Sequence, residues 1–206
     1  MKYAEYLNEN DTMFLDGFPE ALQEKVMDVL FSIHVQTPGD SCDPMPSWRR
    51  PKREWYVLST GESVSFPYRV YDLDGPPSAQ GFGDPDGERI YHCIMTRSSD
   101  GWTRERHLKQ LLDKSLPEWC LPYLLKLSSE YVIEILNVLY DGLKDRDNTD
   151  LQRFCQNNPA MLKKSYARMV SYWNEYYRGT NWKLKNYVGH KLFRECFAPN
   201  VNIERL

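Results

Sequence analysis

The helical character of the chain is decided by residues 160–179, which read AMLKKSYARMVSYWNEYYRG. Apolar and aromatic side chains recur there at helical spacing, at Leu162, Tyr166, Met169, Val170, Trp173 and Tyr177. Gly179 follows this stripe directly, where the C-terminus of a helix favours glycine. The spacing predicts one long helix that buries Tyr166, Trp173 and Tyr177 in a core.

The sequence around this stretch has the same periodicity. Asp100 is placed to cap a helix that carries Leu108, Leu111 and Leu112, and Pro117 opens another over 118–126. Ser128 or Ser129 is predicted to cap a helix with the stripe Val132, Leu136, Leu139 and Leu143, and shorter helices are expected around Leu151–Phe154 and Leu184–Leu192. Such chained helices predict either a bundle or a solenoid of helix pairs.

The N-terminal half is more varied. A short helix is expected at Tyr3–Asn8 and a firmer one from Pro19 to near Val35, followed by an irregular, proline-rich segment at 37–53. Two β-prone runs within 54–71, with Gly61 between them, predict a hairpin.

The glycine- and proline-rich stretch 74–87 predicts a long exposed loop. Ile90–Met95 fits a strand or the first turns of a helix, and the helical sequence after it favours the helix.

These patterns predict a mainly α (α+β) protein with a small β element. We expect three parts, 1–53, 54–89 and 90–206, within one compact domain. Residues 101–143 hold an arginine-containing helix, a Pro117-Glu118-Trp119 start and a long apolar helix, an arrangement that resembles HEAT-like repeat pairs. The resemblance implies stacked helix pairs in the C-terminal half.

The composition is that of an ordinary globular domain, with 41% apolar and 27% charged residues among 206. No run approaches the roughly 18 apolar residues of a membrane span, and Met1–Glu5 lacks the apolar core of a signal peptide, so a cytoplasmic location is expected. The five cysteines are odd in number, widely spaced and without a CxxC pair, which favours buried free thiols over a disulfide framework.

Charge is distributed very unevenly along the chain. Residues 163–194 contain eight Lys or Arg and only Glu175 as an acid, a net of +7, whereas the whole chain carries −3 and the remainder therefore −10. The segment is also rich in Tyr and Trp. Such a composition is typical of a surface that meets an anionic partner, or of a basic helix pair docked on an acidic body. The binding candidates are Arg168, Tyr172, Lys183, Lys185, Lys191 and Arg194.

A second polar cluster occupies residues 97–107. Asp100, Arg104 and His107 fall near one another on a helix and could form an acid–base site with an anion-binding arginine. The competing interpretation makes Asp100 a cap, leaves the arginines in solvated ion pairs and places His107 on the helix surface.

Metal and cofactor sites are not indicated. The histidines His34, His92, His107 and His190 are scattered, and the acidic stretch Asp141–Asp150 lacks the glycine and terminal glutamate of a calcium loop. Glu130 and Glu134 stand one helical turn apart and could pair, but carboxylates at this spacing more often mark a wet face.

The sequence thus leads to three hypotheses. The first is a non-enzymatic protein–protein interaction protein, of bacterial immunity or regulatory type. The second is a nucleic-acid-associated protein that uses the 163–194 segment. The third is an enzyme centred on Asp100, Arg104 and His107.

Overall fold

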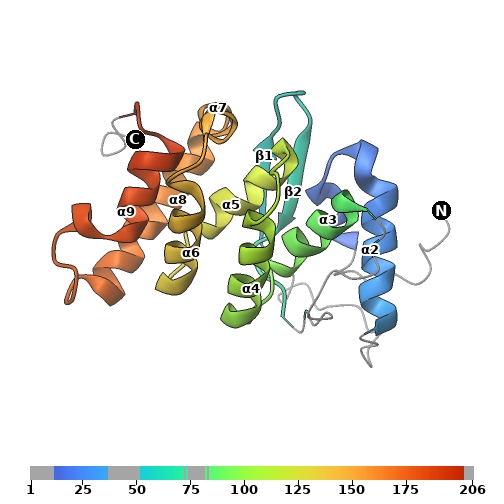
Figure 1. Cartoon of the computed structure of the whole chain (residues 1–206), viewed down its shortest axis with the longest axis horizontal. Coiled ribbons are helices and arrows are strands. Elements are labelled where there is room, and N and C mark those ends of the chain that lie inside the picture. The colour runs from blue at the N-terminus through green and yellow to red at the C-terminus, as the bar shows by residue number, and fades with distance from the viewer. Residues whose placement is uncertain (1–11, 37–51, 72, 74–81, 83, 202–206) are drawn as a thin grey trace. The chain divides into compact units, whose positions relative to one another are not determined.

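In the computed structural model, residues 12–36, 52–71, 73, 82 and 84–201 are described (Figure 1). The chain is mostly helical, with one small antiparallel sheet of two strands, so the prediction of a mainly α protein with a hairpin is confirmed. The expected helix at Tyr3–Asn8 and the segment 37–51 lie outside the described residues. Whether the helices form a bundle or HEAT-like pairs stays a prediction.

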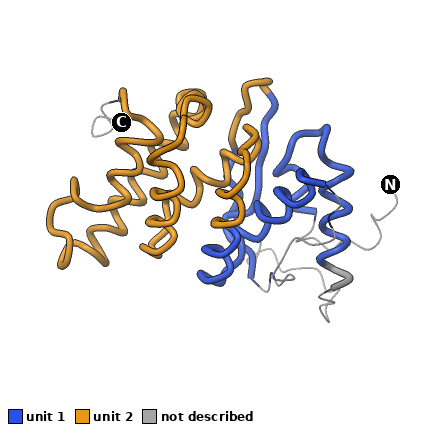
Figure 2. The backbone as a smooth tube through the Cα atoms, in the orientation of Figure 1, with its two compact units in different colours: residues 1–55, 62–107 blue, residues 56–61, 108–206 orange. Residues whose placement is uncertain are grey.

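The chain divides into two compact units (Figure 2). Unit 1 comprises residues 1–55 and 62–107, and unit 2 comprises 56–61 and 108–206. The hairpin, formed by β1 (Arg53–Val57) and β2 (Ser63–Pro67), and helix α4 (Gly101–Leu112) each contribute residues to both. The three expected parts, 1–53, 54–89 and 90–206, do not coincide with these units, and the expectation that they lie within one compact domain stays a prediction.

Unit 1 is built around two helices, α2 (Gln23–Gln36) and α3 (Pro85–Met95), which pack on each other. Short 3₁₀ turns at Leu15–Gly17 and Glu20–Leu22 precede α2. The core is filled by one face of α2, by the apolar residues of β2 and by α3, with Val26, Leu30, Val64, Phe66, Ile90 and Ile94 all buried. The two helices and the strand therefore share one apolar core.

Helix α3 begins with the sequence Asp84-Pro85-Asp86-Gly87, which was predicted to be loop; that prediction was wrong for these residues. The Asp84 carboxylate accepts hydrogen bonds from the backbone N–H groups of Asp86 (2.9 Å) and Gly87 (2.8 Å), and Pro85 suits the first turn because its missing N–H is not needed there. A helix start of this kind resembles a turn in composition, which explains the error.

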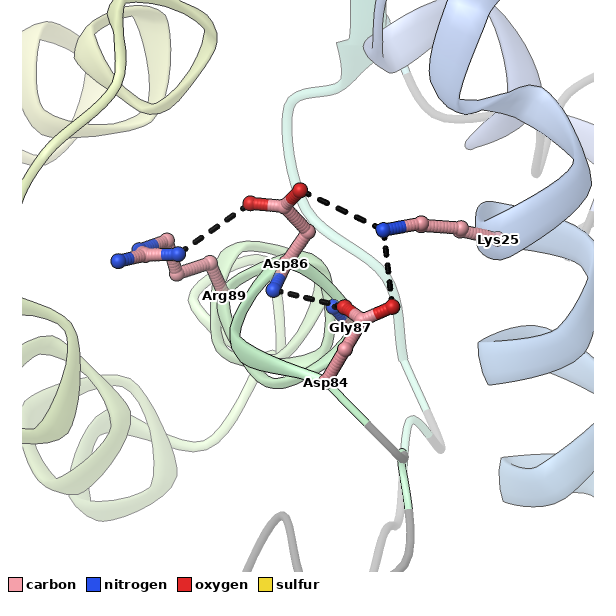
Figure 3. Close-up of polar contacts among 5 residues, drawn as sticks. All are labelled: Lys25, Asp84, Asp86, Gly87 and Arg89. Carbon is pink, nitrogen blue, oxygen red and sulfur yellow. Dashed lines mark hydrogen bonds and ion pairs between the residues drawn. The ribbon is translucent and has the colours of Figure 1, made fainter.

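Ion pairs join this helix start to α2 (Figure 3). The Lys25 ammonium lies 2.8 Å from the Asp84 carboxylate and 3.4 Å from that of Asp86, which also pairs with Arg89 at 3.2 Å. The Lys25 contact, with the two backbone bonds, holds the pKa of Asp84 below its usual range.

Unit 2 contains the 3₁₀ turn η4 (Glu118–Cys120) and the helices α5 (Leu121–Leu127), α6 (Ile133–Leu143), α7 (Thr149–Asn157), α8 (Pro159–Tyr172) and α9 (Val188–Leu192). Every residue of α5 is buried, and α9 packs against α6 and α8. Helix α6 follows an extended Val132. The predicted caps Ser128 and Ser129 instead donate back to the carbonyls of Leu125 and Lys126, so that prediction was wrong.

Two π-turns interrupt the helical geometry of unit 2, η5 (Trp173–Tyr177) after α8 and η7 (Phe193–Phe197) after α9. In η5 the N–H of Arg178 donates to the carbonyl of Trp173 at 2.8 Å, five residues back instead of four. The wider turn changes the direction in which the side chains that follow it point. Trp173 and Tyr177 are half-exposed, which corrects the prediction that both are core.

The cysteines within the described ranges, Cys93, Cys120, Cys155 and Cys196, are all free and buried, as predicted. Burial raises the pKa of the Cys155 thiol above its usual value, and that of Cys196 to about 12. Such thiols are poor nucleophiles near neutral pH.

Candidate functional site

The basic segment of unit 2 faces solvent. Seven of its eight cationic side chains are exposed and Arg168 is half-buried. They lie on α8, just after η5, on the 3₁₀ turn η6 (Leu184–Asn186) and on α9. Among the predicted binding residues, Lys183, Lys185, Lys191 and Arg194 are exposed and Tyr172 is half-exposed.

Large aromatic side chains accompany these cations. Tyr131, Tyr176 and Trp182 expose 43%, 60% and 71% of their surface, which is unusual for residues of this size. The Lys183 ammonium lies 4.4 Å from the centroid of the Trp182 ring, and the Arg178 guanidinium 6.0 Å from that of Trp173. We call the solvent-facing Tyr, Trp, Lys and Arg side chains of 168–194, together with Tyr131, the basic–aromatic surface.

Tyrosines form a connected cluster within this surface. The ring centroid of Tyr131 lies 5.8 Å from that of Tyr172 and 6.1 Å from that of Tyr176, and the latter two rings are 6.1 Å apart. Tyr177 continues the cluster, at 6.5 Å from Tyr176, and stacks on the buried ring of Tyr187 at 5.4 Å. Contacts of this kind fix the rings in place.

The cluster is attached to α6 and the core by Tyr177 and Tyr187. The Tyr177 hydroxyl donates to the carbonyl of Tyr131 at 2.6 Å, which ties η5 to the segment before α6. Burial raises the pKa of Tyr177 and of Tyr187 above the ordinary tyrosine value. Both therefore stay neutral throughout the physiological range.

Some acidic side chains lie within or beside the surface. Glu134 and Glu175 are exposed, and Glu195 accepts a 2.5 Å hydrogen bond from the Tyr140 hydroxyl, which raises the pKa of Tyr140 to about 12. The sequence reasoning had missed Tyr131, Tyr176 and Trp182 as site residues. Exposure of Trp182 could have been predicted from its position just after Gly179, where a helix was expected to end. Nothing in the sequence relates Tyr131 to residues 172–177.

The three weak catalytic candidates all belong to unit 1 and have separate partners. Asp100 is an exposed helix cap whose carboxylate accepts from the Thr103 N–H at 2.7 Å, and bonds from Thr103 hold its pKa below the usual range. Arg104 is buried and donates to the carbonyls of Ser98 (2.9 Å) and Ser99 (2.8 Å). The interpretation of this arginine as a solvated surface residue was wrong.

His107 is also buried, although the structural interpretation had placed it on the helix surface. Its Nδ1 atom lies 2.9 Å from Nδ1 of the buried His92. Burial first, and then the nearby His92 and Arg106, lower the pKa of His107 to about 3. Asp100 thus caps a helix, Arg104 binds the carbonyls of Ser98 and Ser99, and His107 pairs with His92.

Within the described ranges, no group of three or more His, Cys, Asp or Glu side chains is arranged to hold a metal ion. In the calcium-loop-like stretch 141–150, Asp141 pairs with Lys144, Asp147 accepts from Thr149 and Asp150 pairs with Arg153, so each of these carboxylates has a local partner. Glu130 is buried whereas Glu134 is exposed, so the two carboxylates sit in different environments.

None of the helices in the described part of the chain has the length and apolarity to cross a membrane.

Unit 2 has a small apolar depression of about 200 Å³ between α7 and the residues after η7, lined by Cys155, Leu162 and Phe197 among others. It is small beside a typical ligand pocket and carries no charged side chain.

Comparison of the chain with protein-family models, with curated proteins and with solved structures gives no match.

Proposed function

We propose that the protein is a non-enzymatic interaction protein that binds an acidic surface of a partner protein through the basic–aromatic surface of unit 2. One observation carries the proposal: seven cations of a segment with net charge +7 are exposed, and the same segment exposes 60% of Tyr176 and 71% of Trp182. Burying large aromatic side chains contributes most to binding energy, while surrounding charges select and steer the partner.

The arrangement of the aromatic rings favours a protein partner over a nucleic acid. Single-stranded nucleic acid stacks on open aromatic faces. Here the rings of Tyr131, Tyr172 and Tyr176 are tilted or edge-on to one another and do not form a row of parallel faces, and one face of Trp182 meets the Lys183 ammonium. Exposed Glu134 and Glu175 would also repel a phosphate backbone.

The finer version of the proposal is an immunity or regulatory protein, of bacterial type and acting in the cytoplasm, that occludes its partner. Its mechanism is steric and electrostatic and needs no reacting group. The separate structural roles of Asp100, Arg104 and His107 support this version over an enzyme.

Affinity capture from the native lysate, at low and high salt and with or without nuclease, tests the proposal. We expect one protein with an acidic surface in stoichiometric amount, unaffected by nuclease. The variant Lys183→Glu/Lys185→Glu/Lys191→Glu should lose it. The matched control Lys52→Glu/Lys109→Glu/Lys144→Glu changes the net charge equally at exposed lysines elsewhere and should retain it. Nucleic acid that is removed by nuclease, or equal loss in both variants, would refute the proposal.

A further inference from the structure

Resting on the proposed function, we infer that the tyrosine anchor, formed by Tyr131, Tyr172 and Tyr176, holds one apolar or aromatic side chain that projects from an acidic segment of the partner. The exposed lysines of the basic–aromatic surface attract the segment, and the tyrosines retain it.

The anchor is preorganised by contacts behind it. Its three ring centroids lie 5.8–6.1 Å from one another, and the Tyr177 hydroxyl bonds the carbonyl of Tyr131 at 2.6 Å. Tyr177 in turn stacks on Tyr187, whose ring is 1% exposed. A partner therefore meets rings that are already ordered, and this lowers the entropy lost on binding.

The π-turn η5 sets the direction of Tyr176, one of the three rings of the anchor. In an unbroken α-helix, Tyr176 would follow the buried Met169 by seven residues and lie on nearly the same face. Because the N–H of Arg178 bonds five residues back, the surface after Tyr172 is rotated, and Tyr176 emerges beside Tyr172 and Tyr131. π-turns often occur at functional sites, and this one stands where the exposed tyrosines gather.

The charge around the anchor defines the ligand. At the rings themselves the charges nearly balance, with Arg168 one turn before Tyr172, Arg178 just after η5, and the acids Glu134 and Glu175. The cationic surplus continues past Tyr187, which stands in the chain between the exposed Lys185 and Lys191. The contacts of Tyr177 with Tyr176 and with Tyr187 join the anchor to this basic stretch, so an acidic segment that carries one apolar residue complements both parts.

Selection of a displayed library of random short peptides against the whole chain tests the inference. We expect enrichment of peptides rich in Asp and Glu that hold one Phe, Trp, Leu or Met. Peptides of that composition should bind Tyr172→Ala and Tyr176→Ala at least about tenfold more weakly, mainly through faster dissociation that persists in high salt. Tyr71→Ala, which removes a tyrosine of unit 1 that is 73% exposed, should bind as the parent does.

Deletion of Asn174 probes the π-turn itself. Removing one exposed residue converts the five-residue turn into an ordinary helical one and should weaken peptide binding by a similar factor, in a protein whose circular dichroism and cooperative melting are retained. The alanine variants keep the test decisive if the deletion fails to fold.

The outcomes separate the inference from the proposed function. If acidic peptides are enriched and are lost with the three lysine reversals, but bind the tyrosine variants unchanged, the anchor is refuted and the basic surface stands. Enrichment without acidic residues, no enrichment, or tyrosine-dependent binding of single-stranded DNA in place of peptides would also overturn the inference.

Discussion

The Nδ1 atoms of His92 and His107 lie 2.9 Å apart within unit 1, and the two side chains are only 2% and 0% exposed. One ring must donate its proton and the other accept it, so this hydrogen bond requires at least one neutral imidazole. A second proton would place two cations side by side in a buried site, near Arg106.

We expect the free energy of unfolding to fall as the pH drops below 6.5. Because the pKa of His107 is about 3 in the folded chain and 6.5 unperturbed, the unfolded chain binds an extra proton between these values. The contribution of His107 to the free energy of unfolding is full above pH 6.5. It is lost as the pH falls toward about 3, by about 1.4 kcal/mol per pH unit. Urea unfolding across this window measures it. If the free energy of unfolding of His107→Gln falls just as steeply with pH, groups other than His107 cause the pH dependence.

Gly87→Ala should destabilise the chain, although alanine is normally the better helix residue. A Cβ at Gly87 would lie 2.4 Å from the carbonyl oxygen of Phe82, a backbone atom that cannot move aside easily. We expect a loss of about 1–3 kcal/mol, as for other overpacked sites. Gly179→Ala is the control, since nothing lies within 4 Å of its Cβ and the change should stay within about 0.5 kcal/mol. Equal stability of the two variants would contradict the predicted clash.

Asp84 should stabilise unit 1 as a helix cap more than as an ion-pair partner. Lys25 and Asp84 keep 41% and 43% of their side chains exposed, so solvent screens their attraction. Asp84→Asn, which retains a capping oxygen, should unfold close to the parent, and Asp84→Ala should unfold at clearly lower urea. Lys25→Met should have a small effect that shrinks further with salt. A large loss in Asp84→Asn would give the ion pair the leading role.

Asn158 should be essential to unit 2. Its side-chain oxygen accepts from the N–H of Val57 at 2.8 Å, and its nitrogen donates to the carbonyls of Val57 and Phe154, both at 2.9 Å. Asn158→Ala leaves these backbone groups without that partner, and we expect a loss of about 2–3 kcal/mol. The exposed neighbour Asn157→Ala should cost much less. Matching thermal melts for the two variants would show that water replaces the side chain.

Association with the captured partner should slow as salt is added, because exposed lysines steer an acidic surface over long distances. The reversal of Lys183, Lys185 and Lys191 should lower the association rate and flatten its dependence on salt. Surface plasmon resonance at several ionic strengths measures both quantities. An association rate that does not respond to salt would argue against electrostatic steering.

The positions of the helices could largely be predicted from the sequence, because the apolar stripe of an amphipathic helix depends only on the spacing of nearby residues. The helix capped by Asp100, the one opened by Pro117 and the one with the stripe from Leu162 occur near their predicted positions. The hairpin turns at Gly61, whose φ of +85° favours glycine. Residues Asp84–Gly87 were wrongly predicted to be loop because the residues that cap helices and those that form turns are chemically alike.

The candidate site was readable only in part. Net charge located the basic segment, but it left open whether lysines such as Lys183 and Lys185, which are exposed, face solvent or dock on the acidic remainder. The π-turn that exposes Tyr176 has no local signature, and Tyr131 reaches the anchor from 41 residues earlier in the chain than Tyr172. Burial of His107 likewise depended on His92, which comes from another helix.

The sequence by itself determined the helical class, the hairpin and the uneven charge, since each follows from spacing or composition within a short window. Only the tertiary structure decided which side chains share a site. A tyrosine anchor, a buried histidine pair and the Asn158 bridge all join residues that are distant in the chain, and packing against neighbours, not local propensity, sets their burial and contacts.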